Sequence, residues 1–424
     1  MTSWHAEWAW LGGEEAVAGV LLEAEGPVLT RVTAEVGRPP AGAVRLAGLT
    51  MPGLFNGHSH VFHRALRART QSGAGTFWSW RDRMYDLALR LDPDTLFRLA
   101  RATFAEMLVS GITAVCEFHY LHHPDGMDDA VIAAAADAGI AMTFLDTCYL
   151  RAGFAGEPLA PAQERFSDGS AAGWRDRATA LEARHAGARF GVAVHSVRAV
   201  DPETIARLAR WAAERHAELH VHVSEQRPEN DACRLATGRT PTRLLADCGA
   251  LGPRTTAVHA THVSPEDVSL LGGTGTRVCL CPTTERDLAD GVGPAGALVE
   301  AGSPLVLGTD SQAVVDLFAE ARATELDERL VRGRRGLLQP RALLAAAVGH
   351  RSLAPGEPAD LVTVAVDTPR TAGFRPPTAA GTAVFAATAA DVREVVVAGR
   401  HVVQGGRHTT IDAGFELSCA LAQL

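Results

Sequence analysis

Three histidines lie close together near the start of the chain, where residues 56–70 read NGHSHVFHRALRART. They are His58, His60 and His63, and imidazole is both a common metal ligand and a common acid or base in catalysis. His58 and His60 are two residues apart, so on a β-strand their side chains point to the same face. Two imidazoles on one face form half of a typical zinc site. His63 is out of register with this pair and needs a separate explanation.

Histidines and acids also occur where later apolar runs end. They are His220, His222 and Glu225 in ELHVHVSE, His259 and His262 in TTAVHATH, and Asp310 in PLVLGTDS. With His58 and His60, six of the 17 histidines stand at the ends of three such runs. If the runs are parallel strands of one barrel, their carboxyl ends meet and bring these groups together. Such a set can hold a divalent metal ion and activate water.

The apolar runs alternate with Ala-rich segments of helical periodicity, which is the pattern of a (β/α)8 TIM-type barrel. Residues 92–111, 127–139 and 201–216 are predicted helices. We therefore predict a catalytic barrel over residues 49–354, with its active site at the carboxyl ends of the strands. The predicted strands are residues 49–60, 112–120, 141–150, 189–197, 218–225, 255–262, 277–284 and 304–311.

The two ends of the chain differ from the barrel segment. Residues 1–48 and 355–424 contain short β-like runs separated by turn residues, such as DLVTVAV and VREVVVAGRHVVQGGR. Runs of this kind are typical of antiparallel strands joined by tight turns. We predict that both ends combine into one small β-sandwich domain.

The composition excludes several classes of function. A net charge of −9 and a pI of about 6 provide no basic face for nucleic acid or an anionic membrane. No apolar run reaches the roughly 18 residues of a membrane span, and the N-terminus lacks a signal-peptide pattern. The seven scattered cysteines favour reduced thiols. We therefore expect a cytoplasmic protein that acts on a small molecule.

Taken together, these motifs resemble the amidohydrolase superfamily over the whole chain, including the β domain made from both ends. The resemblance rests on the His-x-His of the first strand, a histidine in each of the fifth and sixth strands, and the aspartate of the eighth. Seven segments are further similar to the formimidoylglutamate deiminase family. In chain order they are NGHSHVFHRALR, FWSWRDRMY, CEFHYLHH, HSVRAV, HVSEQRP, VHATH and GTDS.

The resemblance implies a metal centre with one ion. Binuclear members of the superfamily bridge two metal ions with a carboxylated lysine, but all 40 basic residues of this chain are arginines. The donor set suits zinc first, with ferrous iron as the alternative. Its implied ligands are His58, His60, His222 and Asp310. His220, one pleat deeper on the fifth strand, and His262 are expected outside this set.

The resemblance also assigns catalytic and substrate-binding roles. Asp310 takes a proton from the attacking water, His259 steadies the tetrahedral intermediate, and Glu225 moves protons to and from substrate nitrogen. Two arginines suit a substrate with two carboxylates, because guanidinium binds carboxylate in a bidentate manner. His63 occupies a position where some relatives have a substrate-contacting glutamine. The implied substrate-binding residues are His63, Arg81, Tyr120, His195 and Arg198.

These matches imply hydrolytic deimination of N-formimino-L-glutamate to N-formyl-L-glutamate and ammonia, a reaction of histidine degradation. Another mononuclear deaminase or chlorohydrolase, acting on a heterocycle such as guanine, would share the metal ligands but would not need two arginines. A metal-binding barrel without catalysis would need neither Glu225 nor Asp310. By analogy with the superfamily, a homodimer is expected.

Overall fold

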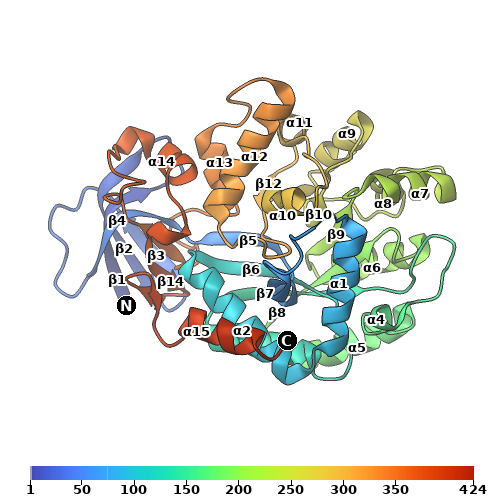
Figure 1. Ribbon diagram of the computed structural model, residues 1–424. Coiled ribbons are helices and arrows are strands. Elements are labelled where there is room, and N and C mark those ends of the chain that lie inside the picture. Colours follow the sequence, from blue (N-terminus) through green and yellow to red (C-terminus); the bar gives the residue numbers. More distant parts are fainter. Residues whose placement is uncertain (1, 74) are drawn as a thin grey trace.

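The structure is a computed structural model and describes residues 2–73 and 75–424. Its centre is a closed barrel of parallel strands in the order β10-β11-β12-β5-β6-β7-β8-β9, surrounded by helices (Figure 1). The predicted (β/α)8 barrel is thereby confirmed. The barrel strands are β5 (Leu54–Ser59), β6 (Ile112–His119), β7 (Ala141–Cys148), β8 (Arg189–Ser196), β9 (Leu219–Val223), β10 (Thr255–His259), β11 (Arg277–Leu280) and β12 (Leu305–Leu307).

The first predicted strand, 49–60, is wrong as a single element. The chain instead forms β4 (Val44–Pro52) in a second sheet and then β5 in the barrel. The break falls at Gly53, whose amide donates to the Asp360 carbonyl at 2.9 Å. A Cβ on Gly53 would lie 2.1 Å from the Thr113 hydroxyl, so a side chain does not fit there. The break could not be predicted from hydrophobicity, because β4 and β5 are both buried and together form one continuous apolar run.

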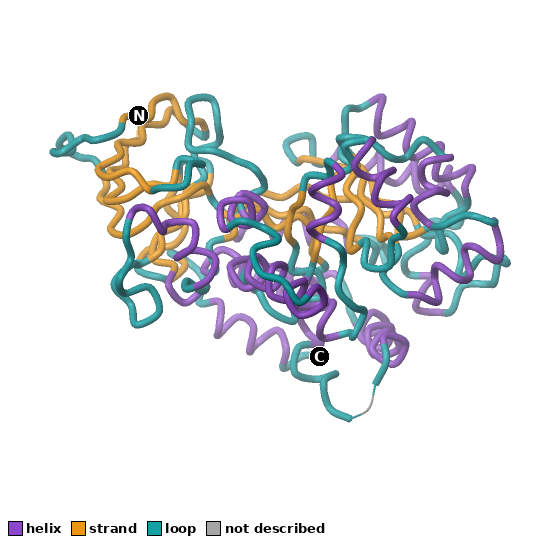
Figure 2. The backbone as a smooth tube through the Cα atoms, turned by 90° about the horizontal axis from the view of Figure 1, so that it is seen from above, coloured by secondary structure: helices purple, strands orange, loops and turns teal. Residues whose placement is uncertain are grey.

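Both chain ends contribute to the second sheet, which lies to one side of the barrel (Figures 1 and 2). Its strand order is β16-β15-β14-β13-β4-β1-β2-β3, so segments from the two ends meet where β4 pairs with β13. At this pairing the hydroxyls of Thr50 and Thr363, 313 residues apart in the chain, are 2.9 Å apart. The other strands are β1 (Thr2–Trp10), β2 (Ala16–Glu25), β3 (Val28–Thr33), β13 (Leu361–Val364), β14 (Val392–Val397), β15 (Arg400–Gln404) and β16 (Arg407–His408).

The helices begin where the sequence supplies capping groups. The Asp92 carboxylate accepts from the Thr95 amide at 2.8 Å, and the Asp201 carboxylate accepts from the Thr204 amide at 3.0 Å. A proline follows each aspartate, which suits the first helical position. No helix in the described part of the chain is long and apolar enough to cross a membrane. The longer helices are α1 (Phe77–Arg90), α2 (Pro93–Val109), α3 (Met127–Ala138), α5 (Ala171–Arg184), α6 (Pro202–Glu214), α7 (Arg227–Thr237), α9 (Pro265–Gly273), α12 (Leu317–Arg332), α13 (Pro340–Ala347) and α15 (Ala413–Leu421). The shorter ones are α4 (Pro161–Glu164), α8 (Pro241–Asp247), α10 (Pro282–Asp287), α11 (Ala295–Ala301) and α14 (Ala379–Phe385).

Candidate metal centre and active site

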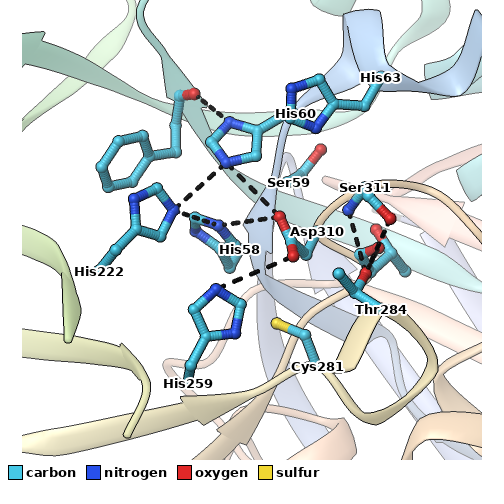
Figure 3. Close-up of polar contacts among 12 residues, drawn as sticks. His58, Ser59, His60, His63, His222, His259, Cys281, Thr284, Asp310 and Ser311 are labelled. Carbon is cyan, nitrogen blue, oxygen red and sulfur yellow. Dashed lines mark hydrogen bonds and ion pairs between the residues drawn. The ribbon is translucent and has the colours of Figure 1, made fainter. Parts of the chain in front are cut away.

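Four side chains converge at the carboxyl ends of the barrel strands (Figure 3). The Nε2 atom of His222, on β9, lies 3.1 Å from Nε2 of His58 and 3.4 Å from Nε2 of His60. Asp310 follows β12, and its Oδ1 atom lies 3.3 Å from His58 Nε2 and 3.5 Å from His60 Nε2. A tetrahedral ion with bonds of about 2.1 Å separates its ligands by about 3.4 Å. The four predicted ligands therefore have the spacing of a metal centre.

The outer ring nitrogens of two histidines are held by backbone carbonyls. His60 Nδ1 donates to the Phe118 carbonyl at 2.7 Å, and His222 Nδ1 donates to the His195 carbonyl at 2.8 Å. Each ring thus keeps its proton on Nδ1 and turns an unprotonated Nε2 toward the centre. Burial lowers the pKa of both rings and of His58 below the usual histidine value, so all three are neutral. Neutral imidazoles beside one carboxylate fit a divalent metal ion.

Backbone hydrogen bonds fix the aspartate against the first barrel strand. The Asp310 amide donates to the His58 carbonyl at 3.0 Å, and the His60 amide donates to the Asp310 carbonyl at 3.0 Å. Asp310 has a φ of 42°, in the left-handed region that non-glycine residues rarely adopt. Such a conformation costs about 1–3 kcal/mol and persists only where the surroundings impose it. Asp310 is one of the four converging side chains, so this strained backbone conformation sets the direction in which its carboxylate points.

A buried network supports the residue between the two histidine ligands. The Ser59 hydroxyl donates to the Glu117 carboxyl at 2.6 Å and accepts from the Gln312 amide nitrogen at 2.9 Å. Glu117 also accepts from the Val61 amide at 2.8 Å, and burial raises the pKa of Glu117 to about 8. These bonds connect β5, β6 and the segment after β12. Neither Glu117 nor Gln312 was predicted: Glu117 lies inside the segment CEFHYLHH but before the end of its strand, and Gln312 directly follows GTDS.

Glu225 and His259 stand beside the ligands and are arranged for proton transfer. Glu225 Oε1 lies 3.6 Å from His259 Nε2, and that nitrogen lies 3.9 Å from Asp310 Oδ2. On its other side, His259 Nδ1 lies 3.4 Å from Glu285 Oε1. Burial lowers the pKa of His259, but the three carboxylates outweigh it and raise the pKa well above the usual value. Burial raises the pKa of Glu225 to about 7, where a carboxyl can both accept and release a proton.

The predicted substrate-binding residues all line one pocket above the metal ligands. They are His63, Arg81, Tyr120, His195 and Arg198. His63 Nε2 is 2.7 Å from the Tyr120 hydroxyl, and burial lowers the pKa of His63 to about 3, so its ring is neutral. Arg81, on α1, has its guanidinium carbon 4.5 Å from the Trp78 ring centroid and 5.3 Å from that of Tyr85. Trp78 thus supports an arginine, whereas Trp80 lines the pocket itself.

Two other histidines of the strand-end motifs lie away from this pocket, as predicted. His220 is buried below the metal ligands, and His262 is not among the pocket residues. The pocket also contains residues for which no role was predicted, among them Tyr85, Tyr149, Phe166, Ser196 and Glu229. Of these residues, Glu229 is the one whose place in the sequence indicates a position near the pocket. It follows Glu225 by four residues, at the start of a helix.

A second group of histidines and acids, which we term the Arg177 cluster, surrounds Arg177 of α5. His122 Nδ1 donates to Asp128 Oδ1 at 2.8 Å, and His119 Nε2 lies 3.3 Å from the same oxygen. The other ring nitrogen of His122 donates to a backbone carbonyl at 2.9 Å. Arg177 binds the second oxygen of Asp128 at 2.9 Å. The cluster also includes Asp146 and Asp168, which bind Arg177 at 2.7 and 2.8 Å.

Comparison with known proteins identifies the family. The family model described as "Amidohydrolase family" matches residues 49–402. This chain belongs to the amidohydrolase family. It is 36% identical to formimidoylglutamate deiminase of Pseudomonas aeruginosa over 410 residues, which cover 89% of this chain and 90% of that protein. It is also 31% identical to 8-oxoguanine deaminase of the same organism, over 78% of each chain.

Two solved structures match this chain over its whole length. An amidohydrolase from Brucella melitensis has a TM-score of 0.89 at 30% identity and covers 100% of this chain and 99% of its own. Atrazine chlorohydrolase from Arthrobacter aurescens TC1, solved with zinc, has a TM-score of 0.90 at 22% identity and 100% coverage of both chains. At that identity the match concerns the fold alone. The amidohydrolase described here is a hydrolase that acts on C–N bonds, and the resemblance seen in its motifs is confirmed.

Proposed function

We propose that this amidohydrolase hydrolyses N-formimino-L-glutamate to N-formyl-L-glutamate and ammonia, with one divalent metal ion per chain. The observation that carries the proposal is the division of charge in the pocket. Asp310 and Glu225 lie beside the metal ligands, whereas Arg81 and Arg198 line the pocket near Tyr85 and His195, where both arginines act to lower the pKa of these two side chains. The proposed substrate has the complementary arrangement, with a cationic formimino group at one end and two carboxylates at the other.

The metal ion would be held by the three neutral imidazoles of His58, His60 and His222 and by the Asp310 carboxylate. Zinc is the first expectation for this donor set, and ferrous iron is the alternative. When bound, such an ion acts as a Lewis acid and makes water a nucleophile at neutral pH. Atrazine chlorohydrolase, whose fold this chain shares, was solved with zinc, which agrees with this choice.

The chain's own acids and bases divide the proton transfers. Asp310 Oδ2, near the centre and unpaired with the ligand histidines, accepts the proton of the attacking water. His259, charged because three carboxylates surround it, donates a hydrogen bond to the oxygen of the tetrahedral intermediate. Glu225 carries a proton to the departing nitrogen. Its pKa of about 7 suits this exchange near neutral pH.

The arginines decide which nitrogen departs. Arg198 and Arg81 bind the glutamate carboxylates away from the metal end, which leaves the small terminal nitrogen of the formimino group nearest Glu225. Protonation of that nitrogen releases ammonia and N-formyl-L-glutamate. Protonation of the other nitrogen would instead release formamide and glutamate.

A heterocycle deaminase is the second candidate, because 8-oxoguanine deaminase is 31% identical to this chain. A flat neutral heterocycle would have no group to neutralise the two arginines of the pocket wall. Buried or half-buried arginines without an anion are unfavourable in such a ligand complex. The pocket therefore favours the dicarboxylate.

The decisive experiment follows ammonia release from N-formimino-L-glutamate, guanine and 8-oxoguanine and chloride release from a chlorotriazine, with proton NMR of the products. We expect ammonia and the N-formyl signal from the first compound alone. Replacing Arg198 with Lys should raise KM by about 10-fold or more, because the bidentate contact is lost while the charge is kept. Formamide in place of ammonia would refute the deiminase assignment, and turnover of a heterocycle alone would favour the second candidate.

A further inference from the structure

Glu229 is a buried carboxylate of the pocket wall that has no part in the proton transfers described above. It lies in the first turn of α7, four residues after Glu225. Its Oε1 atom is inaccessible to water and has no hydrogen-bond partner among the described residues. A buried acceptor without a partner is costly, and an unpaired carboxylate oxygen more so. An oxygen in this state within a binding pocket points to a donor supplied by the ligand.

The surroundings of Glu229 place it between the two ends of the pocket. The charges of Arg198 and His259 and the hydroxyl of Ser196 act to lower its pKa, although burial outweighs them and leaves the pKa raised. Arg198 belongs to the carboxylate-binding end, and His259 lies 3.9 Å from the Asp310 carboxylate at the metal end. Glu225, in turn, is near enough to Glu229 for their charges to interact. Glu229 therefore faces the middle of any ligand that spans the pocket.

The proposed substrate has a cationic group at that position. Its formimino group is an amidinium, in which the positive charge is shared by a terminal nitrogen and an internal nitrogen bonded to the glutamate α-carbon. With the carbon of this group at the metal end and the carboxylates at the arginines, the internal nitrogen lies between them. A charged N–H donor and a carboxylate form one of the stronger kinds of hydrogen bond, and the bond is stronger still where water is excluded.

We infer that Glu229 binds the internal N–H of the amidinium and so selects the cationic substrate over the neutral product. The inference rests on the proposed function. Hydrolysis converts the amidinium into a neutral formamide group, whose N–H forms only an ordinary hydrogen bond. Glu229 consequently strengthens binding of the substrate and not of the product, which helps the product leave. The two arginines bind substrate and product alike.

The test compares Glu229→Gln with the wild-type enzyme. Glutamine keeps the size and one acceptor oxygen but removes the charge. We expect KM for N-formimino-L-glutamate to rise about 10- to 100-fold, with a small change in kcat. The inhibition constant of the product, N-formyl-L-glutamate, should stay within about threefold, because that ligand is neutral where Glu229 meets it. Asp231→Asn, on the exposed side of the same helical turn, is the matched control and should change neither constant.

Two outcomes would overturn the inference. If Glu229→Gln weakens substrate and product equally, Glu229 acts by orienting Arg198 and does not bind the cation. If KM is unchanged, Glu229 has no contact with the substrate. Glu229→Asp provides a second test should the glutamine variant not fold, because it keeps the charge and should retain a preference for substrate over product; loss of that preference would refute the inference. Absence of ammonia with the wild-type enzyme would instead refute the proposed function.

Discussion

The metal centre and the Arg177 cluster contain the same residue types in different states. In each, two histidines and an aspartate place ring nitrogens and a carboxylate oxygen within 4.8 Å of one another. At the metal centre, the Nδ1–H groups of His60 and His222 donate hydrogen bonds to backbone carbonyls. Their Nε2 atoms carry no proton and face one another. In the Arg177 cluster, both ring nitrogens of His122 donate to oxygens.

The difference shows that spacing alone does not define a metal site. A metal needs lone pairs that converge, and the His122 nitrogens have none to offer because each holds a proton. The cation is already present in the Arg177 cluster, since Arg177 contacts Asp128, Asp146 and Asp168. At the metal centre, within the described part of the chain, no arginine lies within ion-pair distance of Asp310. Two features thus distinguish a metal centre from an ion-pair network. In the metal centre the inward-facing histidine nitrogens lack protons, and no guanidinium of the described residues neutralises the carboxylate.

The largest effect is expected from removing an acid of the metal centre. Asp310→Ala removes both a metal ligand and the proton acceptor, so activity should fall by more than about 10³-fold and the metal content should fall well below one ion per chain. Elemental analysis and ammonia release measure the two effects. The matched change Asp128→Asn, in the Arg177 cluster, should leave one ion per chain. Loss of that ion in the variant would place it in the Arg177 cluster, and two ions in the wild type would refute the mononuclear centre.

The Arg177 cluster should matter for stability instead. Arg177→Gln leaves three buried carboxylates without their shared cation, and breaking such a buried pair costs about 3–5 kcal/mol. Urea unfolding measures this loss, and the metal content should not change. Arg184→Gln, on the same helix but in an exposed pair with Asp129, should cost less than about 1 kcal/mol. Equal losses for the two variants would contradict the assigned role.

Glu225 tests whether acids of the metal centre act through proton transfer. Glu225→Gln keeps the shape of the side chain, so metal content, KM and unfolding free energy should change little, whereas kcat should fall about 10²-fold. Steady-state kinetics with metal analysis separates these quantities. A variant that turns over at nearly the wild-type rate would place the proton carrier elsewhere.

The smallest effect is a pH dependence from the Arg177 cluster. Burial and Arg177 lower the pKa of His122, but Asp128 and Asp146 outweigh them and raise it above the usual 6.5. A raised pKa in the folded state stabilises the fold below pH 6.5, and this contribution is lost as pH rises through the folded-state pKa. The unfolding free energy of the wild type relative to His122→Gln should therefore decline with rising pH in that range. A difference that grows with pH would show that His122 is neutral in the fold.

The convergence of His58, His60, His222 and Asp310 could be predicted because it depends on two regular features. Alternation along a strand places His58 and His60 on one face, and the parallel barrel brings the end of β5 near the ends of β9 and β12. The roles of His119 and His122 could not be read in the same way, because the motif HYLHHPDGMDD does not indicate that Arg177, 55 residues after His122, lies beside them. Glu229 was missed for a similar reason, since the rotation of α7 decides whether its carboxylate faces the pocket.

Because β4 pairs with β13, this part of the second sheet cannot form until most of the chain has been synthesised. The Thr50 hydroxyl meets Thr363 across 313 residues, and β5 closes the barrel against β12, at Asn56 and Leu307. At roughly 5–20 residues per second, a ribosome needs about 15–60 s to reach the second threonine after making the first. During that interval β4 can pair with β1 and β5 with β6, but the other edge of each strand lacks its final partner and is open to wrong ones. The hydrogen bonds between His60 and Asp310 must also wait, because Asp310 follows His60 by 250 residues, so the candidate ligand set is complete only when the last barrel strand has been made.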